Sequence, residues 1–329
     1  MSVTRERPDR GNGKTCADPS RFSWDYRKHR SISQRNGRHG NLRWEIRAHT
    51  HEDWVFGRNW IDKVMNSSGG QAGFRHVVIT GASSGIGAAL AKYYARPSMR
   101  LSLLGRNTSR IAAIVRACQD AGATVQSDIG DVTDAIFMSR WLEACDDAAP
   151  IDLLIANAGV GGQSAMTTSA AETLAAAHAV FSTNVIGVAN SILPVLPRLV
   201  GRRRGHVVLL SSLAGYLGMP ISPAYCASKA AVRVYGEGLR RSLAPHGVRV
   251  TVVSPGFVQT PMSESIPGQL PFLWDCQRAA RHIAAGIAKA QHEIAFPWPM
   301  VMLSRLAGFL PSSVLDPILH RIRQNRVNA

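Results

Sequence analysis

The sequence has few cysteines, and their arrangement argues against a disulfide framework. The 329 residues include five cysteines, which are Cys16, Cys118, Cys145, Cys226 and Cys276. They are odd in number and scattered, no CxxC pair occurs, and no cluster of cysteine and histidine has the spacing of a metal site. We therefore expect reduced thiols and no bound metal.

The sequence also lacks the apolar N-terminal run of a secretory signal. Arg and Asp interrupt its first residues, and Glu6, Asp9, Asp18 and Asp25 break the basic stretch that a transit peptide would need. We expect a cytoplasmic protein. A peripheral position at the inner face of a membrane is the alternative.

Acidic residues are scarce beside basic ones. The chain has 38 Lys and Arg against 22 Asp and Glu, which gives a formal net charge of +16. Such a surplus suits a nucleic acid, an anionic membrane or phosphorylated ligands, and it also suits a generally Arg-rich proteome. No aromatic stacking platform and no recognition helix is visible, so we expect no nucleic-acid partner.

Composition divides the chain into three parts. Residues 1–72 are rich in Arg, Gly, Asn and Ser and have little apolar periodicity, so we expect a disordered N-terminal extension or, if the true start is Met65, a mis-assigned one. Residues 73–262 form the expected catalytic core. Residues 263–329 form the expected substrate lid and an apolar C-terminal segment.

In the core, short apolar runs alternate with helical stretches. This alternation is typical of a parallel sheet covered on both faces, and right-handed crossovers make it a doubly wound α/β sheet of the Rossmann type. Ligands of such sheets bind at the carboxyl ends of the strands. The expected strands are 76–80, 101–104, 123–127, 151–156, 206–210, 248–253 and 293–296, and the expected helices are 85–95, 108–121, 133–145, about 170–200 and 224–244.

A glycine-rich turn joins the first expected strand to the first helix. Gly81 permits a tight turn, Gly85 lets the backbone approach a pyrophosphate, and Gly87 allows close packing of the helix on the strand. The helix N-terminus then offers N–H groups to phosphate. The spacing is GxxxGxG, and an ordinary glycine-rich turn is the alternative. The expected phosphate-binding residues are Gly81, Ser83, Ser84, Gly85, Ile86 and Gly87.

The end of the second strand favours NADP over NAD. An acidic residue there would bind the ribose 2′-hydroxyl of NAD, but the strand ends in Gly105, Arg106 and Asn107. The guanidinium of Arg106 matches the geometry of a 2′-phosphate. The alternative is a solvated Arg106 that only stacks on adenine.

Tyr225 and Lys229 stand four residues apart in a helical stretch, which places them on one helix face. A lysine cation about 4 Å away lowers a tyrosine pKa by up to about 3 units, which makes Tyr225 competent in acid–base catalysis near neutral pH. Ser212 ends a strand at the same sheet edge and can bind a substrate carbonyl oxygen. Its neighbour Ser211 is the alternative for that role.

Together these motifs resemble the short-chain dehydrogenase/reductase family in its compact, single-domain form. Order and spacing agree across about residues 75–262. The first seventy residues and the segment after 262 have no such counterpart. The motifs are Thr80 to Gly87, Asp131-Val132, Asn157-Ala158-Gly159, Asn184, Ser212, Tyr225 to Lys229, and Pro255-Gly256 with Thr260.

The resemblance implies a role for each matching residue. Tyr225 would pass a proton to or from the substrate oxygen, Lys229 would hold the nicotinamide ribose, Ser212 would orient the carbonyl, and Asn184 would hold a water that relays protons. Asp131 would flank the adenine, with Asp128 as its competitor. The other implied cofactor-binding residues are Val132, Asn157, Ala158, Gly159, Pro255, Gly256, Val258 and Thr260.

The predicted function is that of an NADP(H)-dependent oxidoreductase acting on a carbonyl or alcohol of an apolar, lipid-like substrate. A cofactor-binding regulator without turnover and a sugar-nucleotide epimerase or dehydratase are the alternatives. The resemblance also implies a homo-oligomer, a dimer or tetramer, paired through the helices at about 170–200 and 224–244.

The C-terminal part of the sequence is apolar but broken by prolines. Leu270, Phe272, Leu273 and Trp274 suggest an apolar wall for the substrate. The stretch from 294 to 319 is a poor transmembrane helix. It packs on the domain or a partner subunit, lies on a membrane surface, or completes the substrate pocket. The membrane alternative would be helped by Arg305, Arg321, Arg323 and Arg326.

Overall fold

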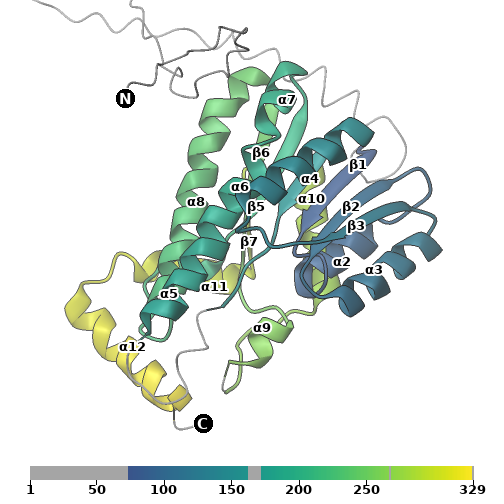
Figure 1. Ribbon diagram of the computed structural model, residues 1–329. Coiled ribbons are helices and arrows are strands. Elements are labelled where there is room, and N and C mark those ends of the chain that lie inside the picture. The colour runs from purple at the N-terminus through teal and green to yellow at the C-terminus, as the bar shows by residue number, and fades with distance from the viewer. Residues whose placement is uncertain (1–72, 162–171, 267, 328–329) are drawn as a thin grey trace, which may run out of the picture. The chain divides into compact units, whose positions relative to one another are not determined.

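A seven-stranded parallel sheet forms the centre of the computed structural model, in the order β3-β2-β1-β4-β5-β6-β7 (Figure 1). This confirms the expected doubly wound fold. The strands are β1 (His76–Thr80), β2 (Arg100–Gly105), β3 (Thr124–Ile129), β4 (Leu153–Ala156), β5 (Gly205–Leu210), β6 (Val248–Pro255) and β7 (Glu293–Phe296).

The structure describes residues 73–161, 172–266 and 268–327, with side chains as far as Arg321. Every described residue belongs to one compact unit of the chain, Val55–Ala329. The expectations for residues 1–72 therefore lie outside the described residues.

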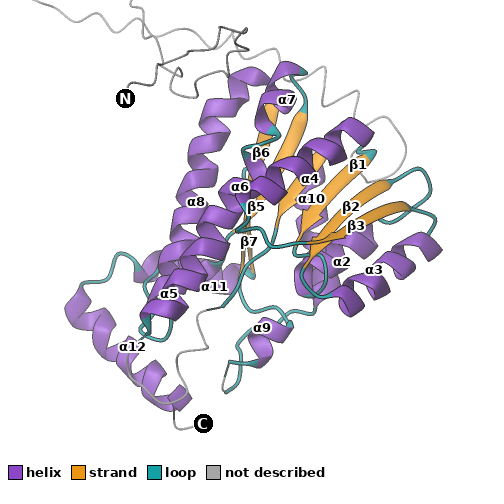
Figure 2. Cartoon of the chain, viewed as in Figure 1, coloured by secondary structure: helices purple, strands orange, loops and turns teal. Residues whose placement is uncertain are grey.

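Helices cover both faces of the sheet (Figure 2). Residues of β1 alternate between two hydrophobic cores, because successive side chains of a strand point to opposite faces. Val77 and Ile79 enter one core and Val78 enters the other. The first core contains residues of α2 (Gly85–Tyr94), α3 (Thr108–Asp120) and α10 (Cys276–Ala288). The second contains residues of α4 (Ala135–Ala148), α6 (Gly187–Ile192), α7 (Leu196–Gly201) and α8 (Pro223–Leu243).

The helix expected at about 170–200 is interrupted. It consists of α5 (Leu174–Phe181), a π-helical turn η3 (Ser182–Ile186), α6 and α7. By length and composition, Leu174–Gly201 could cross a membrane, but half of its apolar window is buried inside the fold, as expected of a core helix. The expected helix at 133–145 also begins later, because Asp134 caps α4 by accepting a hydrogen bond from the N–H of Phe137.

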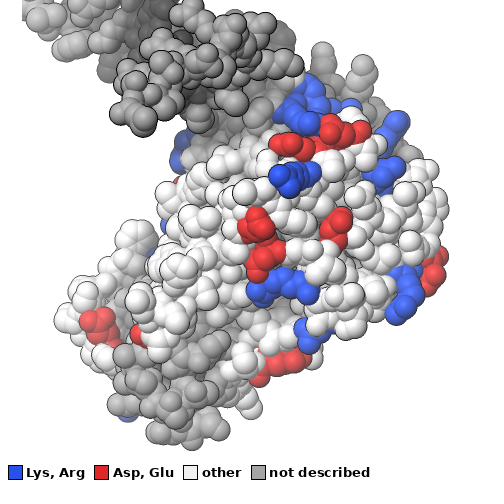
Figure 3. Space-filling model, in the orientation of Figure 1, with Lys and Arg blue, Asp and Glu red and all other residues white. Residues whose placement is uncertain are grey.

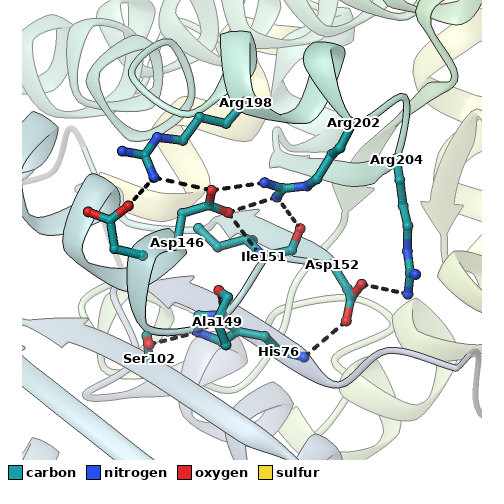
Figure 4. Close-up of polar contacts among 10 residues, drawn as sticks. His76, Ser102, Asp146, Ala149, Ile151, Asp152, Arg198, Arg202 and Arg204 are labelled. Carbon is teal, nitrogen blue, oxygen red and sulfur yellow. Dashed lines mark hydrogen bonds and ion pairs between the residues drawn. The ribbon is translucent and has the colours of Figure 1, made fainter.

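An ion-pair network binds the helices α4 and α7 to each other near the amino end of β4 (Figure 4). The buried carboxylate of Asp146 accepts two hydrogen bonds from Arg202, at 2.7 and 2.8 Å, and one from the N–H of Ile151 at 2.8 Å. Arg198 lies 3.5 Å from the same carboxylate and also pairs with Asp147. Burial opposes ionisation of Asp146, but the bonds from Arg202 and Ile151 outweigh it and lower its pKa.

A second carboxylate, Asp152, joins the amino ends of β1 and β5 (Figure 4). It accepts hydrogen bonds from the backbone N–H of Arg75 at 2.7 Å and of His76 at 3.2 Å, and it pairs with Arg204 at 2.8 Å. Both carboxylates stand at the edge of the sheet opposite the carboxyl ends of its strands. They therefore stabilise the scaffold away from the region where ligands bind in such folds.

Candidate active site

The glycine turn adopts a backbone shape that other residues strain to reach. Gly81 has φ +66° and Gly85 has φ +56°. A Cβ on Gly81 would lie 2.8 Å from the Cα of Ala158, and one on Gly87 would overlap the side-chain nitrogen of Asn157. The turn leaves β1 and opens α2, as the sequence predicts. It therefore stands at the N-terminus of α2, the kind of place where phosphate groups bind.

The segment that follows β4 is hydrogen-bonded to this turn. It consists of Asn157, Ala158 and Gly159. The amide nitrogen of Asn157 donates to the carbonyl oxygens of Thr80, at 2.9 Å, and Gly81, at 3.1 Å. The hydroxyl oxygen of Thr80 accepts from the N–H groups of Asn157 and Ala158. This role of Thr80 is not predicted from the sequence, although its place as the last residue of β1 is a signal for it.

Arg106 and Asp131 lie together after the carboxyl ends of β2 and β3. A guanidinium nitrogen of Arg106 is 3.3 Å from a carboxylate oxygen of Asp131. The competitor Asp128 instead accepts a hydrogen bond from the indole of Trp141 at 2.9 Å. Val132 is buried against Gly187, so its side chain packs in the core.

Asn184 lies in the π-helical turn η3 and is fully buried. Its side-chain oxygen accepts from the N–H of Val160 at 2.8 Å, and its amide donates to the Val160 carbonyl and the Ser228 hydroxyl, each at 3.0 Å. Ser228 donates in turn to the carbonyl of Tyr225 at 2.8 Å. Ser228 was missed by the sequence analysis, although it stands inside the Tyr225 to Lys229 motif.

Lys229 is buried in α8 and directs its ammonium group toward the sheet. It donates to the Leu210 carbonyl at 2.9 Å and lies 5.7 Å from the centre of the Tyr225 ring. A Cβ on Gly159 would be 3.3 Å from the lysine nitrogen and 3.1 Å from the side-chain oxygen of Asn184. The structure thus brings Tyr225, Lys229, Asn184 and Gly159 together.

The expected lowering of the Tyr225 pKa is wrong for this structure. Burial raises the pKa of Tyr225, and a hydrogen bond with Ser212 only partly opposes that rise. Burial also lowers the pKa of Lys229 to about 8, because a low-dielectric site disfavours its charged form. Desolvation therefore outweighs the attraction between the lysine cation and the tyrosinate that the helical spacing predicts.

Ser211 and Ser212 have different surroundings. The buried hydroxyl of Ser211 donates to the backbone carbonyl of Lys229 at 2.7 Å, so its role is structural. The hydroxyl oxygen of Ser212 accepts from the N–H of Ala214 at 3.1 Å, and the residue caps the short helix η4 (Leu213–Tyr216). The Ser212 hydroxyl also donates to the Pro255 carbonyl at 3.4 Å and lowers the pKa of Tyr225 against the effect of burial, so it is the serine that belongs to the site.

The segment after β6 closes the site on another side. The N–H of Gly256 donates to the Phe296 carbonyl at 2.7 Å, and Val258 is buried. Thr260 caps α9 (Pro261–Glu264) and lies against Gly85, where an added Cβ would be 3.0 Å from its methyl group. Pro255, Gly256 and Thr260 therefore stand at the same sheet edge as the glycine turn.

Trp274, one of the residues expected to form an apolar wall for the substrate, is partly buried. Its ring stacks on Phe296, with the ring centres 4.7 Å apart, and Arg278 lies 4.0 Å above it. Trp274 thus packs between the segment after α9 and β7. Phe272 and Leu273, in contrast, are exposed. The sequence could not separate them, because all three are apolar and adjacent.

These features agree with what comparisons with known proteins show. A family model described as short chain dehydrogenase matches residues 75–270. The chain belongs to the short-chain dehydrogenase family. Like other members of this family, it is an oxidoreductase. A protein from Myxococcus xanthus described as an uncharacterized oxidoreductase is 38% identical over 252 residues, which cover 76% of this chain and 98% of that protein.

Solved short-chain dehydrogenases have the same fold. One from Sphingobium yanoikuyae in complex with NADPH is 26% identical, with a TM-score of 0.62 over 72% of this chain and 97% of that one. Another from Burkholderia phymatum in complex with NAD is 27% identical, with a TM-score of 0.64 over 71% and 92%. A nicotinamide cofactor therefore suits this site.

The residues of the chain fit such a cofactor. Gly81, Gly85 and Gly87 let the turn pack closely on Asn157, Ala158 and Thr260, and the turn opens α2, whose N-terminus attracts phosphate. Lys229 is a buried cation beside Gly159, where a ribose hydroxyl can accept its hydrogen bonds. Backbone space and hydrogen-bond donors are thus present along one edge of the sheet.

Proposed function

We propose that this short-chain dehydrogenase transfers a hydride between NADP(H) and the carbonyl or alcohol of an apolar substrate. The observation that carries the proposal is the convergence of Ser212, Tyr225, Lys229 and Asn184 beside the glycine turn. The bound nicotinamide supplies or accepts the hydride. Side chains of the protein transfer the proton and stabilise the charge on the substrate oxygen.

In the reducing direction, the Tyr225 hydroxyl gives its proton to the substrate oxygen as that oxygen becomes an alkoxide. Because burial raises its pKa, Tyr225 stays protonated until the substrate oxygen becomes basic enough to accept the proton. The Ser212 hydroxyl donates to the same oxygen and stabilises the developing charge. After the transfer, Tyr225 must take up a new proton. Lys229 and Asn184 would hold the ribose hydroxyl and the water that pass this proton to Tyr225.

The preference for NADP(H) rests on Arg106. Its guanidinium is exposed at the carboxyl end of β2, and no acidic residue ends that strand. A 2′-phosphate can take two of its hydrogen bonds at once. The solved relative from Sphingobium yanoikuyae, which was determined in complex with NADPH, is consistent with this preference.

The test is a fluorescence titration of the purified protein with NADPH and NADH, followed by turnover assays on apolar ketones and aldehydes. Wild type and Tyr225→Phe should bind NADPH alike, and Tyr225→Phe should lose turnover by about 100-fold or more. Arg106→Asp should lose the preference for NADPH. Binding without turnover on any substrate would favour a regulatory protein of the same fold.

A further proposal concerns the exposed apolar surface of α11 (Trp298–Ala307) and the turn after it. Trp298, Leu303, Leu306 and Phe309 are all more than half exposed, and Phe309 reaches 85%. We propose that this surface rests on the cytoplasmic face of an anionic membrane, where an apolar substrate would be delivered. The net charge of +16 supports this.

Sedimentation with anionic vesicles tests the membrane contact. Wild type should pellet with the vesicles, and the double variant Leu303→Asn, Phe309→Ser should not. Leu174→Asn, which removes an exposed leucine of α5, is the matched control and should pellet as wild type does. The face drawn in Figure 3 carries both acidic and basic side chains among uncharged ones.

We also propose that two copies associate through α5 to α7 and α8. Phe181, Ile186, Leu193 and Val234 are exposed apolar residues on these helices. Their burial against a second copy would remove them from water. Light scattering on wild type should give a dimer or tetramer, and Val234→Asp should give a smaller species.

A further inference from the structure

The backbone holds Arg106 and Asp131 side by side. In the pairing of β2 with β3, Gly105 stands opposite Ile129, and the N–H of Gly130 donates to the Gly105 carbonyl at 3.2 Å. Arg106 directly follows β2, and Asp131 comes two residues after the end of β3, next to Gly130. Their proximity is therefore set by the sheet register and not only by two flexible side chains.

The carboxylate of Asp131 is fixed in a definite orientation. One oxygen accepts hydrogen bonds from both the N–H and the hydroxyl of Thr133, each at 2.9 Å. The other oxygen faces the guanidinium of Arg106 at 3.3 Å. Burial acts against ionisation, but the bonds from Thr133 and the charge of Arg106 outweigh it and hold the Asp131 pKa below its usual value.

A 2′-phosphate that binds Arg106 must therefore contend with a carboxylate already there. The phosphate carries almost two negative charges at neutral pH. It either replaces Asp131 as the partner of Arg106 or shares the guanidinium with a like charge. The Arg106 side chain is 62% exposed and can turn toward a new partner. The neutral 2′-hydroxyl of NADH meets no such repulsion.

We propose that Asp131 is a specificity-determining residue, which competes with the 2′-phosphate for Arg106 and so keeps the preference for NADPH over NADH small. This inference rests on the proposed role of Arg106 in phosphate binding. It differs from the adenine contact that the family resemblance implies, because an adenine contact would affect both cofactors alike.

The test is the ratio of the dissociation constants of NADH and NADPH, measured by fluorescence titration for wild type and Asp131→Asn. Asparagine retains an oxygen for the Thr133 bonds and removes the charge. We expect the preference for NADPH to rise about three- to tenfold, the effect of one charge at a partly exposed site. Asp120→Asn changes the net charge equally at the exposed end of α3 and should leave the ratio unchanged.

Other outcomes overturn the proposal. Equal weakening of both cofactors would assign Asp131 to the adenine, and selective weakening of NADPH would show that Asp131 positions Arg106 for the phosphate. An unchanged ratio would show that the pair does not influence specificity. The measurement needs no substrate, so a lack of turnover would overturn the proposed reaction and still leave the Asp131 result readable.

Discussion

The ammonium nitrogen of Lys229 lies 2.9 Å from the carbonyl oxygen of Leu210 and 5.7 Å from the centre of the Tyr225 ring. The lysine is thus held by the end of β5, which is the neighbour of β4 with its Asn157 segment and lies two strands from β1 with its glycine turn. Its burial lowers its pKa to about 8, so near neutral pH it carries a charge that is costly to bury.

That cost predicts a pH dependence of stability. The Lys229 pKa is about 8 in the fold against 10.5 when exposed, so the unfolded chain binds more protons between these values. Stability from this group should therefore rise as the pH increases from about 8 to 10.5, by about 3 kcal/mol in all. Urea unfolding across this range checks it, and Lys229→Met should flatten the rise. An equal slope in both proteins would contradict the prediction.

Asn184→Ala should lower both stability and turnover. It removes the bonds to Val160 and Ser228 and leaves buried polar groups without partners, at a cost of about 2–3 kcal/mol. Turnover should fall by about tenfold or more, because η3 would no longer order the groups beside Lys229. Ser228→Ala, which loses one of these bonds, should have a smaller effect on both. Unfolding curves and steady-state kinetics measure these effects.

Gly87→Ala should abolish cofactor binding. The added methyl group would overlap the Asn157 side chain and the Gly81 carbonyl, both of which shape the turn. Gly238→Ala is the matched control, because nothing lies within 4 Å of its added Cβ in α8. This control should bind NADPH normally and be stabilised by up to about 1 kcal/mol. Fluorescence titration and thermal unfolding compare the two variants. Normal binding by Gly87→Ala would contradict the proposal that the glycine turn binds the cofactor.

Asp146→Asn should destabilise the fold without weakening cofactor binding. It removes the buried carboxylate that partners the half-buried Arg202, at a cost of about 2–4 kcal/mol. Since the Asp146 pKa is lowered in the fold, its contribution is complete above about 3.8 and is lost as the pH falls below that value. Asp147→Asn, at an exposed position, should cost less than about 1 kcal/mol. Urea unfolding at pH 7 and titration with NADPH decide between these outcomes.

Local patterns in the sequence determined most of the scaffold. The alternation of apolar runs and helical stretches predicted the parallel sheet, and β7 has the bounds expected for it. The glycine turn and the Tyr225 to Lys229 spacing were also legible, because each depends on neighbours within a few residues. The π-helical turn at Ser182–Ile186, in which Asn184 is buried, was not legible from the sequence.

Only the tertiary structure decided which charged and polar groups meet. The pairing of Arg106 with Asp131 joins residues 25 apart, and the bond from Asn184 to Ser228 joins residues 44 apart. The effect of burial on Tyr225 was likewise hidden, because helical spacing gives the distance to Lys229 but not the loss of water around both groups. Contacts across strands depend on the register of the sheet, and pKa values depend on how far each group is removed from water. Neither the register nor the desolvation can be read from a local pattern of residues.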